Sequence, residues 1–294
     1  MDCFSLGGMV GNLKLKYSEI FYSIQGEGRW VGVPSVFIRL FGCNFECRGF
    51  GQGRDKSKWV PKDQMPHVTD PNRLNYKSYQ ELPVPEIGCD TSATWSHLYK
   101  HIATNEETSV IAKKATELTA YKTWGNTHLI LTGGEPMLWQ KQLPDLLSQP
   151  EFHTLYNMTI ETNATQKLKP EFKAFLTNMC LHKGLHITWS CSPKLWISGE
   201  DWKDAIKPEV VQDYASIPNS ELYLKFVVQD NEDIKEVKTA HGVFGNFPVY
   251  LMPVGGTEEG LELTEKQVAE LALKYGYRFS PRLHVNLFGN AWGT

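Results

Sequence analysis

The sequence predicts an α/β fold in which mainly parallel strands are joined by crossover helices. Apolar, β-branched runs alternate with stretches of helical periodicity along most of the chain. The polar residues that could carry chemistry follow directly after these runs, at the edge where parallel sheets build their sites. A length of 294 residues suits one such domain, so we expect a single domain over residues 1–294.

The expected strands are short apolar runs bounded by Gly, Pro or polar residues. They lie at residues 34–41, 127–132, 158–162, 186–190, 223–228 and 249–252. Helical patterning occurs near residues 106–121, 138–148, 169–180, 201–214, 231–240 and 263–275. This alternation favours right-handed crossovers between parallel strands.

Residues 48–88 interrupt the alternation. Gly, Pro, Lys, Asp and Asn are scattered there among a few aromatic residues without a clear period. A structureless loop of this length is uncommon in a compact domain unless it has a function, so we interpret the stretch as an insertion. Its basic residues are typical of a solvated surface, with cover for an anionic ligand as the alternative; they are Arg48, Arg54, Lys56 and Lys58.

Composition and charge argue against several classes of function. Hydrophobic residues make up 41% and charged residues 21%, which is close to the globular average. A net charge of −3 lacks the basic signature of nucleic-acid binding. No apolar run approaches the roughly 20 residues that span a bilayer, and Met1–Ser5 lacks the basic flank of a secretory signal. We therefore expect a cytoplasmic protein with small-molecule partners, no nucleic acid and no membrane.

The cysteines suggest a metal site. In a long chain from a reducing compartment they indicate metal ligands or buried thiols before disulfides. Cys43 and Cys47 follow an expected strand, and Cys89 follows residues 48–88. Three thiolates can hold an iron–sulfur cluster and leave one iron open. Spacing alone also allows two half-buried thiols or a zinc pair.

A second pattern is the turn Thr132-Gly133-Gly134-Glu135-Pro136 after a strand. Paired glycines let the backbone approach a ligand, and Glu135 can accept from an amino group, although a plain strand-to-helix turn also fits. With the cysteines, this turn resembles the radical S-adenosylmethionine (SAM) superfamily. The resemblance implies a partial, open TIM-like barrel, a [4Fe-4S] cluster whose open iron holds S-adenosyl-L-methionine, and reductive cleavage to a 5′-deoxyadenosyl radical.

Further motifs are similar to those of the 7-carboxy-7-deazaguanine synthase family and cover most of the chain outside residues 48–88. They are Glu19–Gly28, Gly32–Arg39, Gly42-Cys43-Asn44, Cys89-Asp90-Thr91, Glu161-Thr162-Asn163, Ser192-Pro193-Lys194, Leu251–Pro253 and the tail around His284. The resemblance implies a lyase that converts 6-carboxy-5,6,7,8-tetrahydropterin to 7-carboxy-7-deazaguanine with loss of ammonia. This reaction lies on the route to 7-deazapurine nucleosides such as queuosine.

The resemblance also implies the substrate contacts. Arg39 offers a planar fork for the substrate carboxylate, with a structural ion pair as its alternative. Gln25 carries a donor and an acceptor that can read the amide edge of a pterin, unless its segment is only a flexible turn. No acid or base catalyst is assigned, because radical chemistry carries the reaction. The expected substrate-binding residues are Ile24, Gln25, Gly26, Glu27, Arg39, Thr132 and His284.

For the cluster, the resemblance implies Cys43, Cys47 and Cys89 as ligands. It places Mg²⁺ on the hydroxyl of Thr91, an oxygen donor of the kind this ion prefers, where Asp90 could compete or only cap a helix. Contacts to S-adenosyl-L-methionine are expected from Gly88, Cys89, Asp90, Gly134, Glu135, Asn163, Ser192 and Lys194. The remaining cysteines are interpreted as non-ligands; they are Cys3, Cys180 and Cys191.

The chain departs from the family between Cys47 and Cys89, which family members usually keep close together. Because the cost of loop closure rises only with the logarithm of loop length, three ligands can still converge. The inserted residues 48–88 could cover the cluster, dock the reductant or form a dimer surface.

Two other functions stay open from the sequence. One is an activase that abstracts hydrogen from a glycine of a partner protein, and the other is a non-catalytic zinc or iron–sulfur binding module closed by four protein ligands. For the synthase, the resemblance implies a homodimer and a flavodoxin or ferredoxin as reductant.

Overall fold

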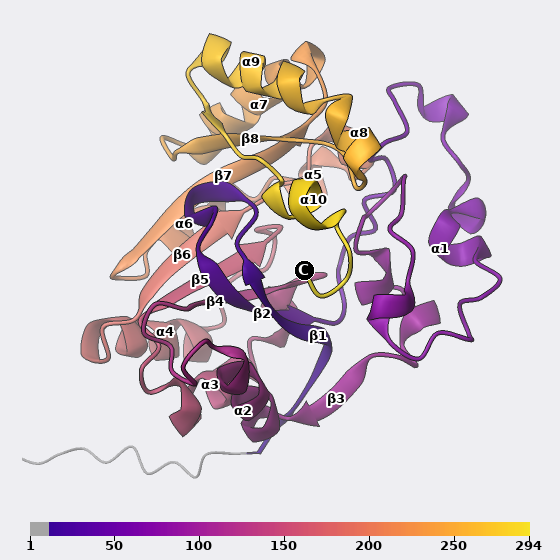
Figure 1. The fold of residues 1–294 in the computed structure, drawn as a ribbon. Helices are drawn as coiled ribbons and strands as arrows, with labels where there is room; N and C mark the ends of the chain where they lie inside the picture. Colours follow the sequence, from indigo (N-terminus) through magenta and orange to yellow (C-terminus); the bar gives the residue numbers. More distant parts are fainter. Residues whose placement is uncertain (1–11) are drawn as a thin grey trace, which may run out of the picture.

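The computed structural model describes residues 12–294, and one nine-stranded sheet forms its framework (Figure 1). The strand order is β3-β1-β2-β4-β5-β6-β7-β8-β9, so within these residues the sheet has two edges and is not closed. Neighbouring strands from β2 to β9 are parallel, whereas β1 runs antiparallel to β2 and β3. The bounds are β1 (Lys14–Ile24), β2 (Pro34–Leu40), β3 (Thr104–Glu107), β4 (His128–Gly133), β5 (Asn157–Thr162), β6 (His186–Cys191), β7 (Ser220–Val228), β8 (Val249–Pro253) and β9 (Arg278–Phe279).

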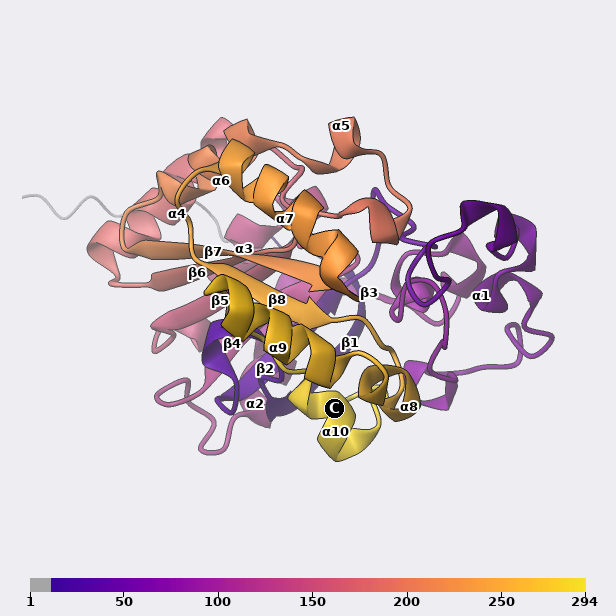
Figure 2. The same cartoon turned by 90° about the horizontal axis from the view of Figure 1, so that it is seen from above.

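Helices connect the parallel strands and pack on the sheet, with α2 on β1, α6 and α7 on β7, and α9 on β8 (Figures 1 and 2). The α-helices are α1 (Pro66–Thr69), α2 (Thr108–Leu118), α3 (Leu143–Leu147), α4 (Pro170–His182), α5 (Trp202–Ala205), α6 (Pro208–Ala215), α7 (Asn231–Phe244), α8 (Glu258–Glu262), α9 (Glu265–Tyr275) and α10 (Leu283–Phe288). The 3-10 helices are η1 (Gly28–Trp30), η2 (Lys56–Lys58), η3 (Lys62–Gln64), η4 (Tyr79–Glu81), η5 (Ser92–Thr94), η6 (His97–Tyr99), η7 (Pro136–Trp139), η8 (Pro150–Phe152) and η9 (Trp196–Ser198). No helix in residues 12–294 combines the length and apolarity that a membrane crossing requires.

The six strands expected from apolar runs are confirmed as β2 and β4 to β8. Their side chains explain why this succeeded, because Ile38, Leu129 and Leu131 are fully buried between the sheet and its helices. The face of each strand that packs into the core carries apolar residues at every second position, and this pattern is visible in sequence.

The helices are confirmed only in part. The regions near 169–180, 231–240 and 263–275 form α4, α7 and α9. The helical region expected near 201–214 is present but divided, because Pro208 begins a separate helix, α6, after the short α5. The helix expected near 138–148 is confirmed only as the shorter α3, which begins at Leu143, while η7 ends at Trp139.

Residues 48–88 lie beside the sheet, on the side away from α4 and α6 (Figures 1 and 2). The two ends of this segment meet, because the amide of Gly88 donates to the carbonyl of Phe50 at 2.8 Å. Arg54 anchors the segment to the start of α7 through ion pairs with Asp230 and Asp233. The long excursion therefore returns the chain to its starting point, which brings Cys89 close to the loop of Cys47.

Candidate active site

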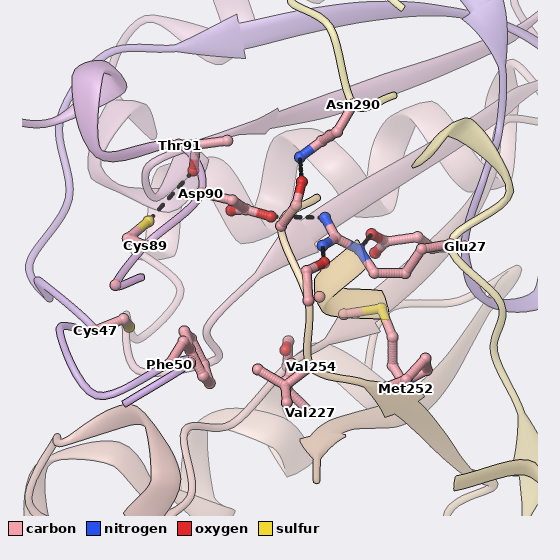
Figure 3. Close-up of a pocket in the computed structure, with 18 of the residues that line it drawn as sticks. Glu27, Cys47, Phe50, Cys89, Asp90, Thr91, Val227, Met252, Val254 and Asn290 are labelled. Carbon is pink, nitrogen blue, oxygen red and sulfur yellow. Dashed lines mark hydrogen bonds and ion pairs between the residues drawn. The ribbon is translucent and has the colours of Figure 1, made fainter. Parts of the chain in front are cut away.

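A cavity of about 1210 Å³ opens at the carboxyl ends of the parallel strands (Figure 3). All but one of the residues that the sequence singled out as ligands or contacts line it. The exception is Glu135, which is fully buried behind the wall. Cys3 lies outside the described residues.

The three expected cluster cysteines share an apolar recess of this cavity. Cys47 packs with Phe45 and Ala205, and Cys43 and Cys89 lie against the same group. Burial and the charge of Glu135 raise the pKa of Cys43 to about 12. Burial likewise raises the pKa of Cys47 and of Cys89. As free thiols these groups stay protonated near neutral pH, so a bound metal would have to supply the charge that stabilises the thiolates.

The backbone of the cysteine loop is fixed by one carboxylate. The amides of Glu46 and Cys47 donate to the same oxygen of Glu200, at 3.0 Å and 2.7 Å. Among residues 12–294, no three His, Cys, Asp or Glu side chains converge closely enough to hold a single metal ion. A [4Fe-4S] cluster instead binds each thiolate to a different iron, and three thiols spread around one apolar recess fit that requirement.

The Gly133-Gly134 turn packs directly against the cysteine loop. A Cβ atom on Gly134 would lie 2.2 Å from the carbonyl oxygen of Gly42 and 2.9 Å from the Cβ of Cys43. The amide of Glu135 donates to the same carbonyl of Gly42 at 2.8 Å. Only glycine permits this close approach, which leaves the peptide of Gly134 exposed to the cavity.

Glu135 has a different environment from the one expected. Its carboxylate accepts from the hydroxyl of Thr162 and from the amides of Met137 and Asn163, at 2.7, 3.0 and 2.7 Å. Burial raises the pKa of Glu135, opposed by these donors. The side chain therefore ties the turn after β4 to the end of β5 and points away from the cavity.

The other expected cofactor contacts follow neighbouring strands. Asn163 follows β5 and donates to Asn44 of the cysteine loop at 2.9 Å. Ser192 and Lys194 follow β6, and the ammonium of Lys194 donates to the Ser192 hydroxyl at 3.4 Å. Next to the thiol recess, the Thr91 hydroxyl lies 3.4 Å from the sulfur of Cys89.

A chain of buried charges forms the other side of the cavity (Figure 3). Lys225 donates to Glu27 at 2.5 Å, and Arg282 bridges Glu27 at 3.2 Å and Asp90 at 2.6 Å. Burial opposes ionisation of Glu27, but the charges of Lys225 and Arg282 outweigh it and hold its pKa below the usual range. His284 lies 3.8 Å from Glu27, and burial with the charge of Arg282 lowers the pKa of His284 to about 4.

The turn after β1 is built around Gln25 and Gly26. The side-chain amide of Gln25 donates to Glu161 at 3.1 Å, and its carbonyl accepts from the amide of Glu27 at 3.0 Å. The Thr132 hydroxyl donates to the second oxygen of Glu161 at 2.8 Å. Gly26 packs so tightly against His284 that a Cβ would lie 2.0 Å from its Nδ1.

Arg39 projects from β2 next to Thr132 of β4. Its Nε donates to Glu19 at 2.8 Å, and its side chain is 18% exposed. This contact uses one edge of the guanidinium and leaves the terminal nitrogens for a ligand in the cavity. Both the ion-pair and the ligand-binding interpretations of Arg39 are therefore compatible with one geometry.

Sequence reasoning missed Lys225, Arg282 and the inward direction of Glu161. Lys225 was detectable in the sequence, because it lies in the apolar run of β7. A buried lysine rarely lacks a partner, so its position predicts an ion pair. Arg282 was not detectable, since its partners Glu27 and Asp90 are far away in sequence.

Comparisons with known proteins identify the family of the chain. The chain is 31% identical to the 7-carboxy-7-deazaguanine synthase of Halobacterium salinarum, over 94% of this chain and 91% of that protein. It is 27% identical to the enzyme of the same name from Pyrobaculum aerophilum, over 97% of this chain and 100% of that protein.

The fold resembles a crystal structure of QueE from Escherichia coli, with a TM-score of 0.51 and 18% identity over 91% of this chain and 93% of that one. No protein-family model matches the sequence. Because the identity to the Halobacterium salinarum enzyme exceeds 30% over nearly the whole of both proteins, the chain belongs to the 7-carboxy-7-deazaguanine synthase family.

Proposed function

We propose that this chain contracts the ring of 6-carboxy-5,6,7,8-tetrahydropterin to give 7-carboxy-7-deazaguanine and ammonia, by radical SAM chemistry. The observation that carries the proposal is the shared cavity, whose wall holds three thiols, the Gly134 turn and the Arg39 fork. The names of the relatives support the same reaction.

Cys43, Cys47 and Cys89 would hold the [4Fe-4S] cluster. Gly134, Asn163, Ser192 and Lys194, which line the cavity beside the thiols, would contact S-adenosyl-L-methionine together with the backbone of residues 88–90. When bound, these two groups supply one-electron cleavage of the cofactor and hence the radical that starts the reaction. Glu135 would act indirectly, by holding the turn and Asn163 in place.

Other residues that line the same cavity would bind the substrate. Arg39 is suited to the carboxylate, because its terminal nitrogens form a bidentate fork. Gln25 and Thr132 hold Glu161, so these three side chains form one hydrogen-bonded surface for the polar edge of the pterin. Thr91 presents its hydroxyl to the cavity, and we propose it as a ligand for Mg²⁺.

The open sheet supports a partial barrel of the radical SAM type, formed by a single domain in which residues 48–88 are an insertion. Phe50, Gly51 and Ile87 line the cavity, so the segment would form part of its wall. A flavodoxin or ferredoxin reductant and a homodimer complete the proposal, and these two rest on the family resemblance alone.

Anaerobic reconstitution with iron and sulfide, followed by turnover with S-adenosyl-L-methionine, dithionite, Mg²⁺ and 6-carboxy-5,6,7,8-tetrahydropterin, tests the reaction. We expect 7-carboxy-7-deazaguanine and ammonia in equal amounts. Cleavage of the cofactor without this product would favour another radical enzyme, such as an activase. A closed metal site with no affinity for the cofactor would favour a binding module.

A further inference from the structure

The guanidinium of Arg39 lies over two aromatic rings. Its guanidinium carbon is 5.4 Å from the ring centroid of Phe21 and 5.8 Å from that of Trp292. Phe21 is itself fixed, because it stacks on Phe37 at 4.7 Å with the rings 1° from parallel. Attraction between a cation and an aromatic face is significant at such separations. Together with the contact to Glu19, the two rings fix both the plane and the edge of the guanidinium.

Trp292 does not share the cavity with Arg39. It lines a second, smaller cavity of about 330 Å³, whereas Arg39 lines the large one. The segment that carries the tryptophan also borders the large cavity, through Asn290 and Thr294. An effect of Trp292 on the orientation of Arg39 would act through the contact between its ring and the guanidinium.

Trp292 is itself held in place by residues 48–88. Its ring lies 5.2 Å from that of Tyr79, in a small cluster with Leu82, Ala93 and Tyr99. Asn290, just before it, donates to the carbonyl of Gly256 at 2.9 Å and fixes the segment that carries the tryptophan (Figure 3). Residues 48–88 therefore contact the large cavity in two ways. Some of them line it directly, and Tyr79 is connected to it through Trp292 and Arg39.

We propose that Trp292 is a positioning residue that holds the Arg39 guanidinium in the orientation that binds the substrate carboxylate. The inference rests on the proposed function, because it assigns the carboxylate to Arg39. It gives residues 48–88 a defined task, which is to seat the tryptophan.

Trp292→Leu tests the proposal, because leucine keeps apolar bulk against Tyr79 but removes the aromatic face. We expect KM for 6-carboxy-5,6,7,8-tetrahydropterin to rise about 5- to 30-fold, with kcat within about threefold of wild type. Trp292→Phe is the matched control and should stay within about threefold in KM. Equal KM for wild type and both variants would overturn the proposal, and so would a rise in KM for Phe as large as for Leu.

Two further measurements separate positioning from a general loss of structure. A pterin without the 6-carboxylate should bind wild type and Trp292→Leu with dissociation constants within about twofold, whereas a carboxylated pterin should bind the variant about 5- to 30-fold more weakly. In an Arg39→Lys background, which lacks the planar fork, Trp292→Leu should change KM by less than about twofold. Equal weakening of both pterins, or independent effects in the double variant, would contradict the proposal.

These experiments also distinguish failure of the positioning role of Trp292 from failure of the proposed function. An active wild type with an unaffected Trp292→Leu variant overturns the positioning role alone. A wild type that binds its cluster and cleaves the cofactor but never makes the deazaguanine product overturns the proposed function, and the inference falls with it.

Discussion

The two sides of the large cavity differ in how complete they are without a ligand. On one side, Cys43, Cys47 and Cys89 line an apolar recess, and burial raises the pKa of each thiol. On the other side, Lys225, Glu27, Arg282 and Asp90 form a continuous chain of ion pairs, of which Asp90 is the most exposed member. The thiol side needs a metal to become charged, whereas the ionic side is already neutralised by the protein.

This difference indicates different consequences of mutation. The thiol side adds little to the stability of the metal-free fold, so its loss should appear as loss of the cluster. The ionic side is part of the fold, because removing one member leaves its partner charged and buried. The predictions below test this contrast, beginning with the largest effect.

Cys89→Ala should abolish both cluster binding and product formation, because only two thiols then remain. Iron and sulfide content after anaerobic reconstitution, together with product formation, measure this. Cys180→Ala is the control, since that thiol is buried in α4 away from the recess. Retention of a full cluster and activity by the Cys89 variant would show that the third ligand lies elsewhere.

Arg282→Met should lower the free energy of unfolding by about 3–5 kcal/mol, because Glu27 and Asp90 lose a buried cation. Arg29→Met is the matched control, since the Arg29 side chain is 45% exposed and its ion pair with Glu221 should contribute under about 1 kcal/mol. Urea unfolding of the two variants measures the contrast. Equal, small effects would mean that the ionic side does not stabilise the fold.

Gly134→Ala should cost about 1–3 kcal/mol and weaken cluster retention, because the added Cβ meets the backbone of Gly42 and the side chain of Cys43. Gly125→Ala should stay within about 0.5 kcal/mol, since a Cβ there has open space. The two thermal melts and iron contents together test whether the turn positions the cysteine loop. Normal iron content in Gly134→Ala would contradict this.

The smallest predicted effect concerns pH. The buried His284 faces Arg282, Glu27, Asp90 and Arg39, and its pKa of about 4 lies below the ordinary value of 6.5. As pH falls through 6.5, the unfolded chain takes up a proton that the folded chain refuses, so stability falls until about pH 4. Between pH 7 and pH 5 the free energy of unfolding of the wild type should fall. In His284→Gln this fall should be smaller by about 1–2 kcal/mol. Burial also lowers the pKa of His128 to about 4, so part of the slope should remain. Identical slopes for wild type and variant would contradict the assignment.

The strands also differ in whether the sequence predicts them. The strands β2 and β4 to β8 were predictable because the positions that pack into the core are apolar in each of them. The edge strand β3 was missed, since Thr104–Glu107 contains no apolar residue and is a strand only by pairing with β1. The strand β1 was also missed, although it contains the buried residues Leu15, Tyr17 and Phe21.

In the site, local motifs were predictable and long-range partners were not. Cys89-Asp90-Thr91 is recognisable as a unit even after residues 48–88. The pairing of Asp90 with Arg282 depends on how β8 and α10 meet the cysteine loop, which no local pattern records. The direction of Glu135 was also hidden, because a glutamate after two glycines can point either into a cavity or into the wall.

The most direct test of the account is the electron paramagnetic resonance spectrum of the reduced, reconstituted protein, recorded before and after addition of S-adenosyl-L-methionine. Three protein thiols and one open iron predict a [4Fe-4S] signal that shifts when the cofactor binds. A signal that the cofactor leaves unchanged would mean that the cluster has no open iron, and it would contradict the assignment of this cavity to radical chemistry.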